Sequence, residues 1–167
     1  GDDFNFCFPF TVIKNFDLNH HCYPLHQSLR VETTKTFSIP SQAFFIAAEI
    51  SACGYVSGQL IEVIVEIRNE SNVEVNEIIV ELIKLIHYNA DNPVPKTRVR
   101  REIAAAAKHD GVGSRNKLTA KMNLTTPPIP PSNIWTCKVL HVFYEIHVTS
   151  KTSGPNRDPV LKIPITV

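Results

Sequence analysis

Apolar and polar residues alternate between residues 60 and 68, with one interruption at Ile64. The apolar positions share a branched β-carbon: Ile61, Val63, Val65 and Ile67. Because successive side chains of a strand point to opposite faces, this period of two predicts a half-buried β-strand. Glycines precede it at positions 54 and 58, and a polar turn at residues 69–72 leads into a second apolar run. The two runs together predict a long antiparallel hairpin.

The second apolar run, residues 73–88, fits two kinds of element. Part of it follows the stripe of an amphipathic helix: Val75, Ile78, Ile79, Leu82, Ile83 and Ile86. Valine and isoleucine dominate the run, and their branched side chains suit a pleated surface. A short turn after a strand also favours an antiparallel return. We therefore predict a strand, with the helix as the alternative.

Similar patterns recur along the chain at residues 4–13, 31–38, 44–51, 117–124, 138–149 and 161–167. Residues 98–108 alternate as well but end in four alanines, which intrinsically favour a helix. Within a sheet, the same alanines would let a strand pack closely against its neighbour. About eight or nine strands between glycine and proline turns, with no secure helix, predict an all-β, antiparallel, immunoglobulin-like sandwich.

Composition and charge narrow the class of protein. The chain has 167 residues, of which 43% are hydrophobic and 20% charged, as in an ordinary globular domain that needs no metal or disulfide to fold. Its formal net charge of +1 gives no global attraction to nucleic acid, and no aromatic residues interleave with its basic residues. We therefore expect no nucleic-acid partner.

The four cysteines do not indicate a metal site. They lie at positions 7, 22, 53 and 137 without a C-x-x-C pair, so free thiols are favoured over a zinc site or disulfides. The cluster His20-His21-Cys22 with His26 has no second pair of ligands nearby. We expect neither a metal nor another cofactor.

Nothing in the sequence predicts an enzyme. The nucleophile elbow, the dinucleotide fingerprint and the P-loop are all missing. His141, Glu145 and His147 alternate on one face of the strand expected at residues 138–149, which leaves an acid–base or metal grouping open. A solvated outer strand face is the simpler interpretation.

One cluster of basic residues follows the turn at residues 91–95: Lys96, Arg98, Arg100 and Arg101. In an extended segment Lys96, Arg98 and Arg100 point the same way. Cations on one strand face can hold phosphate through charge-assisted hydrogen bonds, as in a phosphopeptide or an anionic lipid. The alternative is a polar face whose cations pair with nearby glutamates on other strands.

Several segments, in this order, resemble α-arrestins, the arrestin domain-containing proteins. Phe10-Thr11-Val12-Ile13 and Asp17-Leu18-Asn19 are similar to the segment that joins the two halves of these proteins. Three further groups resemble their C-terminal half: Gly54-Tyr55 with Ser57-Gly58-Gln59, residues 65–69 and Ser71; then Pro131-Ser132 with residues 137–140 and 142–144; then residues 161–165. The resemblance covers nearly the whole chain.

The resemblance implies an arrestin-type β-sandwich at residues 37–167, preceded at residues 1–36 by an interdomain strand and linker from an N-terminal half. It also implies a non-catalytic cytoplasmic adaptor, recruited to the plasma membrane or endosomes. Such adaptors bind membrane-protein cargo for ubiquitination, endocytosis and endosomal trafficking. They recruit a HECT-type ubiquitin ligase through PPxY motifs in a C-terminal tail, and this chain contains no PPxY.

Two residue-level expectations follow from the resemblance. An aromatic face near the start of the chain would be covered by the N-terminal half, and exposed alone would favour self-association: Phe4, Phe6, Phe8 and Phe10. Ser71 stands where the thioredoxin-interacting branch carries a reactive cysteine, so disulfide capture of thioredoxin is not expected.

The alternative to an adaptor is an extracellular immunoglobulin-like adhesion domain. It would pair Cys53 with Cys137 and carry carbohydrate at the sequons that begin at Asn69 and Asn123.

Overall fold

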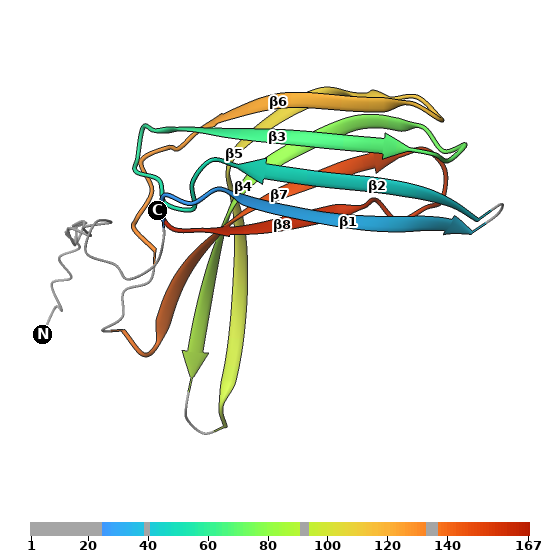
Figure 1. Cartoon of the computed structure of the whole chain (residues 1–167). Coiled ribbons are helices and arrows are strands. Elements are labelled where there is room, and N and C mark those ends of the chain that lie inside the picture. Colours follow the sequence, from blue (N-terminus) through green and yellow to red (C-terminus); the bar gives the residue numbers. More distant parts are fainter. Residues whose placement is uncertain (1–24, 39–40, 91–93, 133–136) are drawn as a thin grey trace, which may run out of the picture.

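The computed structural model describes residues 25–38, 41–90, 94–132 and 137–167, which form a two-layer β-sandwich (Figure 1). One antiparallel sheet has the order β1-β2-β3-β6 and the other β5-β4-β7-β8. The strands are β1 (Leu29–Ser38), β2 (Ser41–Ile50), β3 (Leu60–Asn69), β4 (Val75–Ala90), β5 (Lys96–Val112), β6 (Lys117–Thr125), β7 (Leu140–Thr152) and β8 (Val160–Ile165).

The ambiguous run at residues 73–88 is a strand, as predicted. It becomes β4, which pairs with β5 on one side and with β7 on the other. The alanine run also forms a strand, because Ala105 and Ala107 of β5 lie opposite Leu82 and Val80 of β4. Pairing with β4 thus outweighs the helix propensity of the alanines. The strand expected at residues 4–13 lies outside the described residues.

The core lies between the two sheets. It is made by alternate aliphatic residues of the central strands, which are fully buried: Ile46, Ala48, Val63, Val65, Ile78, Val80, Leu82, Ile146 and Val148. Each such large side chain stabilises the fold by about 1.5–3 kcal/mol relative to an exposed one.

The first sheet begins earlier than the expected boundary between linker and sandwich at residues 36 and 37. β1 starts at Leu29 and pairs with β2 along its whole length. Phe37 is buried with its ring centroid 5.9 Å from that of Phe44. The Leu25 carbonyl also accepts hydrogen bonds from the backbone amides of Cys53 and Gly54, at 2.8 and 3.0 Å. Residues 29–36 are therefore part of the sandwich in this structure.

The second sheet extends beyond the sandwich. Residues 83–90 of β4, 96–103 of β5 and 140–145 of β7 continue together as a projection, here called the arm, which hangs below the sandwich in Figure 1. At the base of the arm, Val142 and Tyr144 of β7 still belong to the core, and Tyr144 pairs with Ile165 of β8. The pairing of β4 with β5 shifts register between Leu82 and Ile83, where the arm begins. A bulge of this kind bends a sheet and re-aims its side chains.

The backbones of β5 and β4 approach each other closely at Gly111. A β-carbon at this position would lie 1.8 Å from the carbonyl oxygen of Val75, whereas one at Gly113 would meet only Asn116 Nδ2, at 3.3 Å. We expect Gly111→Ala to lower the free energy of unfolding by about 1–3 kcal/mol, because strand backbone must move. Urea unfolding of both variants checks this, and equal losses in Gly111→Ala and Gly113→Ala would contradict it.

Asp158 anchors the turn between β7 and β8. Its carboxylate accepts from the Thr152 amide at 2.8 Å, the Thr152 hydroxyl at 3.2 Å and Lys151 Nζ at 3.0 Å. Burial works to raise the pKa of Asp158, but the Thr152 and Lys151 hydrogen bonds outweigh it and lower that pKa.

A lowered pKa gives stability that is present above the unfolded-state pKa of about 3.9 and lost as the pH falls through the folded-state value. We expect Asp158→Ala to cost about 1 kcal/mol at neutral pH, and the difference from the parent to shrink below about pH 4. Chemical unfolding over a pH series measures this. A difference that does not depend on pH would contradict the assignment.

Candidate functional site

The basic cluster lies on the arm, and the strand register divides it. Lys96, Arg98 and Arg100 lie opposite Ala90, Tyr88 and Ile86 of β4, and therefore share one face. Arg101 lies opposite Leu85 and points to the other face. The cluster thus consists of a row of three cations and one cation on the reverse side.

The three cations of the row differ in their partners. Arg100 Nε lies 2.9 Å from Glu102 Oε1, and Lys84 Nζ lies 3.3 Å from the other oxygen of the same carboxylate. Lys96 and Arg98 are exposed and form no ion pair with any residue that the structure describes. Positive charge is therefore left unpaired toward the tip of the arm.

The row lies on an open sheet edge. β5 is the last strand of its sheet, and residues 96–101 are exposed without interruption. The reverse face of the same strand carries two exposed apolar side chains, Val99 and Ile103, at 52% and 60%. An edge with free backbone groups, cations on one face and apolar side chains on the other can accept a further strand.

The reverse face of the arm continues across β4 and β7. Val99 lies opposite His87, and Leu85 opposite Phe143. The Phe143 ring lies 5.0 Å from the His87 ring and 6.3 Å from the His141 ring, centroid to centroid. Phe143 is nevertheless 38% exposed, so this face presents aromatic and aliphatic surface.

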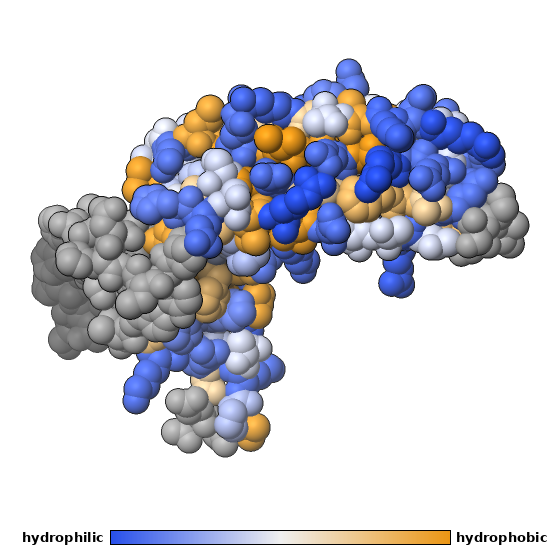
Figure 2. Space-filling model, viewed as in Figure 1, coloured by the Kyte–Doolittle hydropathy of each residue, from blue (hydrophilic) through white to orange (hydrophobic). Residues whose placement is uncertain are grey.

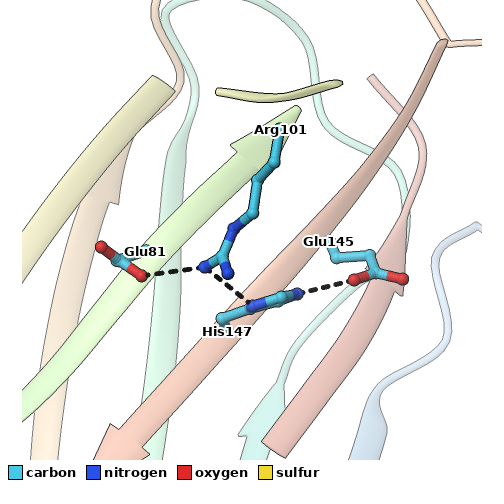
Figure 3. A network of polar contacts seen from close by, with 4 residues as sticks. All are labelled: Glu81, Arg101, Glu145 and His147. Atoms are coloured by element: carbon cyan, nitrogen blue, oxygen red, sulfur yellow. Dashed lines mark hydrogen bonds and ion pairs between the residues drawn. The ribbon is translucent and has the colours of Figure 1, made fainter. Parts of the chain in front are cut away.

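A polar network lies where the arm joins the sandwich (Figure 3). Arg101 Nη2 is 3.4 Å from Glu81 Oε2 and 3.2 Å from His147 Nδ1, and His147 Nε2 is 2.6 Å from Glu145 Oε2. Three strands contribute to it, β4, β5 and β7. Both ring nitrogens of His147 are engaged, so the network links the three strands at the base of the arm.

His147 corrects the expectation of a solvated outer face for His141, Glu145 and His147. His147 is only 4% exposed, although its face is turned away from the sandwich core. Ile83 is likewise fully buried beside the bend. The sheet bends here and Arg101 reaches across from β5, which the pattern within residues 138–149 could not reveal.

Tyr144 ties the other face of the arm to the loop after β6. Its hydroxyl donates to the carbonyl of Pro130 at 2.6 Å. Burial, and then the charge of the nearby Glu102 carboxylate, raise the pKa of Tyr144 well above its ordinary value. The hydroxyl therefore stays protonated and keeps donating throughout the physiological range.

The structure does not support two of the three features expected of an extracellular domain, and the exception is the sequon at Asn123, which is exposed on β6. Asn69 is 2% exposed, and its Nδ2 donates to the carbonyls of Val73 at 2.7 Å and Gly113 at 3.1 Å, so it cannot accept carbohydrate in this fold. Cys53 and Cys137 are free and half-buried. Ser71 is fully buried, and its hydroxyl donates to Asn69 Oδ1 at 2.6 Å, which is a structural role.

Two further predictions from the sequence concern an aromatic face and a metal site. The aromatic face of Phe4, Phe6, Phe8 and Phe10 lies outside the described residues, so its role in self-association stays a prediction. Within the described ranges, no three histidine, cysteine or acidic side chains come together as a metal site.

The two antiparallel sheets around an aliphatic core define an immunoglobulin-like β-sandwich of the arrestin type. Residues 40–167 match the family model of the arrestin (or S-antigen) C-terminal domain. The chain therefore belongs to the arrestin family through this domain, which confirms the resemblance to α-arrestins. Membership of this family supports an adaptor role rather than catalysis.

Curated relatives agree with the family. The chain is 24% identical over 145 residues to arrestin domain-containing protein 1 of Rattus norvegicus, and 23% identical over 145 residues to that of Homo sapiens. Each match covers 85% of this chain but only 32% of the relative. The chain thus spans about a third of these relatives. No helix in the described parts is long and apolar enough to cross a membrane.

Arg101 should matter for stability more than its exposed neighbours. Arg101→Leu removes the partner of the buried His147 Nδ1. We expect a loss of about 1–3 kcal/mol in the free energy of unfolding, because a buried polar atom is left unsatisfied. Arg98→Leu is the matched control and should change it by less than about 0.5 kcal/mol. Indistinguishable denaturation midpoints for the two variants would show that the network does not stabilise the arm.

Proposed function

We propose that this chain is the cargo-binding C-terminal domain of a non-catalytic α-arrestin adaptor. The adaptor would work in the cytoplasm, at the plasma membrane or endosomes. It would bind membrane-protein cargo and deliver it for ubiquitination and endocytosis. The family match and the relatives named arrestin domain-containing protein 1 support this assignment. Recruitment of a HECT-type ligase would depend on a PPxY tail, which this sequence does not contain.

The observation that carries the proposal is the open edge of β5 on the arm. A cargo tail that lies along residues 96–103 would gain backbone hydrogen bonds from the edge. Its side chains would alternate between the row of Lys96, Arg98 and Arg100 and the apolar Val99 and Ile103. The favoured partner is therefore an extended segment that alternates acidic or phosphorylated residues with apolar ones.

The cations also protect the edge in the absence of a partner. Lysine and arginine on an edge strand discourage pairing between identical chains, because like charges would meet. An acidic segment meets no such repulsion. The row would thus select acidic partners over self-pairing, and charge would contribute to the specificity as well as to the affinity.

The test is binding of a fluorescent peptide that alternates phosphoserine with valine. We expect the triple variant Lys96→Gln/Arg98→Gln/Arg100→Gln to bind at least about tenfold more weakly, with a smaller dependence on salt, because charge-assisted contacts are lost. A control triple, Lys108→Gln/Lys121→Gln/Lys162→Gln, removes as many exposed cations from outside the arm and should bind like the parent.

Two outcomes would overturn this binding mode. Equal weakening in both triples would mean that the peptide senses only overall charge. Binding to phosphatidylserine vesicles that depends on the row, without binding of the peptide, would identify the row as a contact for anionic lipid instead.

A further inference from the structure

A proline-rich segment, residues 126–132, follows β6 and belongs to neither sheet. Its prolines stand at four of six successive positions: Pro127, Pro128, Pro130 and Pro131. Proline fixes φ near −65° and restricts the residue before it to extended or polyproline II backbone. Every residue from 126 to 131 is a proline or precedes one. The segment therefore favours a polyproline II helix, which has three residues per turn.

The burial of the segment repeats with the same period of three. Thr126 is 1% exposed and Ser132 8%, and Ile129 midway between them packs against the core. The prolines occupy the positions between these three residues, and Pro128 and Pro130 are exposed. One side of the helix thus faces the sandwich, and the two sides that carry the prolines are turned outward.

Hydrogen bonds fix the segment at its start and at its middle. The Thr126 amide donates to the Gln59 carbonyl at 2.9 Å, and the Gly58 amide donates to the Thr126 carbonyl at 2.8 Å. Further along, the Tyr144 hydroxyl donates to the Pro130 carbonyl at 2.6 Å. The prolines between these anchors are therefore held in place on the surface.

The end of the segment is held by a pair of hydrogen bonds. The Ser132 amide donates to the Val167 carbonyl at 2.6 Å, and the Val167 amide donates to Ser132 Oγ at 2.9 Å. A stiff proline helix that is already fixed at three points loses little freedom when a partner binds it, which lowers the ordering cost of binding.

Exposed apolar side chains flank the start of the segment. Leu60 lies opposite Thr125 and is 54% exposed, and Val56, in the turn before Gly58, is 55% exposed. Figure 1 shows the segment as the orange trace that descends from β6 at the left, and Figure 2 shows hydrophobic side chains on the surface at the same end of the sandwich. A partner that docks on the prolines would bury this apolar surface as well.

From this geometry we propose that residues 127–131 bind the aromatic-lined groove of an SH3-type domain in a partner protein. Such grooves take a polyproline II helix with prolines three positions apart. The segment offers two such pairs, Pro127 with Pro130 and Pro128 with Pro131. The third side of the helix points away from the groove, and here Ile129 already packs that side against the sandwich.

The surrounding sequence narrows the partner further. Neither Pro-Pro step is followed by tyrosine in the spacing of PPxY, so the pattern that WW domains read is missing. No charged residue occurs between positions 122 and 132. The affinity would therefore come from the prolines and the apolar surface beside them, and would depend little on salt. The segment lies outside the β5 edge and does not rest on the proposed cargo binding.

The test is an array of purified SH3 domains probed with the whole chain, followed by calorimetric titration of the domains that bind. We expect at least one SH3 domain to bind with micromolar affinity. Pro128→Ala/Pro130→Ala should weaken this binding at least about tenfold, because both exposed prolines of the helix are lost. The control Pro155→Ala/Pro164→Ala removes two exposed prolines from elsewhere and should keep the affinity of the parent. Both double variants should unfold at the urea concentration of the parent.

Two readouts use the unaltered chain, so damage to the fold cannot mimic them. An excess of a PxxP peptide should displace the chain from the SH3 domain, because both occupy the same groove. Raising the salt concentration should change the affinity by less than about twofold.

Several outcomes would overturn the proposal: no binding by any SH3 domain, equal losses in the two double variants, no displacement by the peptide, or a steep loss of affinity in salt. Binding on a parallel array of WW domains, in place of the SH3 domains, would also overturn it. The triple variant of the arm should bind the SH3 domain like the parent, so failure of this proposal and failure of the proposed function can be told apart.

Discussion

The hydrogen bonding of β4 is the constraint on which the structure depends. This strand pairs with β5 from Val75 to Ala90 and with β7 from Val75 to Tyr88. Its first half, as far as Leu82, supplies buried residues to the core. Its second half continues with the same partners beyond Leu82, where Val142 and Tyr144 of β7 are the last residues that contribute to the core. Because their backbone groups satisfy one another, three strands can leave the sandwich and form the arm without burying unpaired amides.

The bend at Leu82 and Ile83 determines what the arm can present. At this bend Ile83 and His147 are buried, although they lie on the outer face of the sheet. Arg101 of β5 also contacts β7 there, through His147. Arg101 therefore stabilises the junction instead of joining Lys96, Arg98 and Arg100. The bend also carries the edge of β5 clear of the sandwich, so the cations remain exposed to a partner (Figure 1).

The sequence predicted the strands well because a period of two is a local property. β3 follows directly from its alternating branched residues, and β4 follows from its valine and isoleucine content after a short turn. The period of two also places Lys96, Arg98 and Arg100 on one face. The arm was not predictable, since apolar residues continue along β4 past Leu82 and nothing in the sequence marks the register shift with β5 there. The burial of His147 depends on Arg101, 46 positions away in the chain.

The exposed side of the proline segment could not be predicted from the sequence either, for a related reason. The prolines themselves indicate a polyproline II backbone, which is a local property. Which side of that helix faces outward depends on Gln59 and Val167, which bind Thr126 and Ser132 from distant parts of the chain. The spacing of the prolines alone cannot reveal those contacts.

Ion pairs are unevenly distributed over the described surface, and the arm contains cations that face no acid. Most cations of the described sheets face an acid, as Lys108 faces Glu77 and Lys121 faces Glu62. A surface ion pair contributes only about 0–1 kcal/mol, so stability alone imposes little demand for acids at the arm. The unpaired cations therefore cost the fold little stability and remain available for recognition. The formal net charge of +1 does not reveal this local group of positive charge.

The arm and the proline segment meet at Tyr144 of β7. Its hydroxyl binds the carbonyl of Pro130, and in the sheet it lies opposite Lys84 of β4. Surface charges are screened over about 8–10 Å at physiological salt, and the prolines carry no charge, so an anion on the arm has little electrostatic influence on them. Any coupling between the two surfaces would have to pass through the position of Tyr144. The arm and the segment should therefore bind independently unless a ligand on the arm moves β7, because Tyr144 is the residue that connects one to the other.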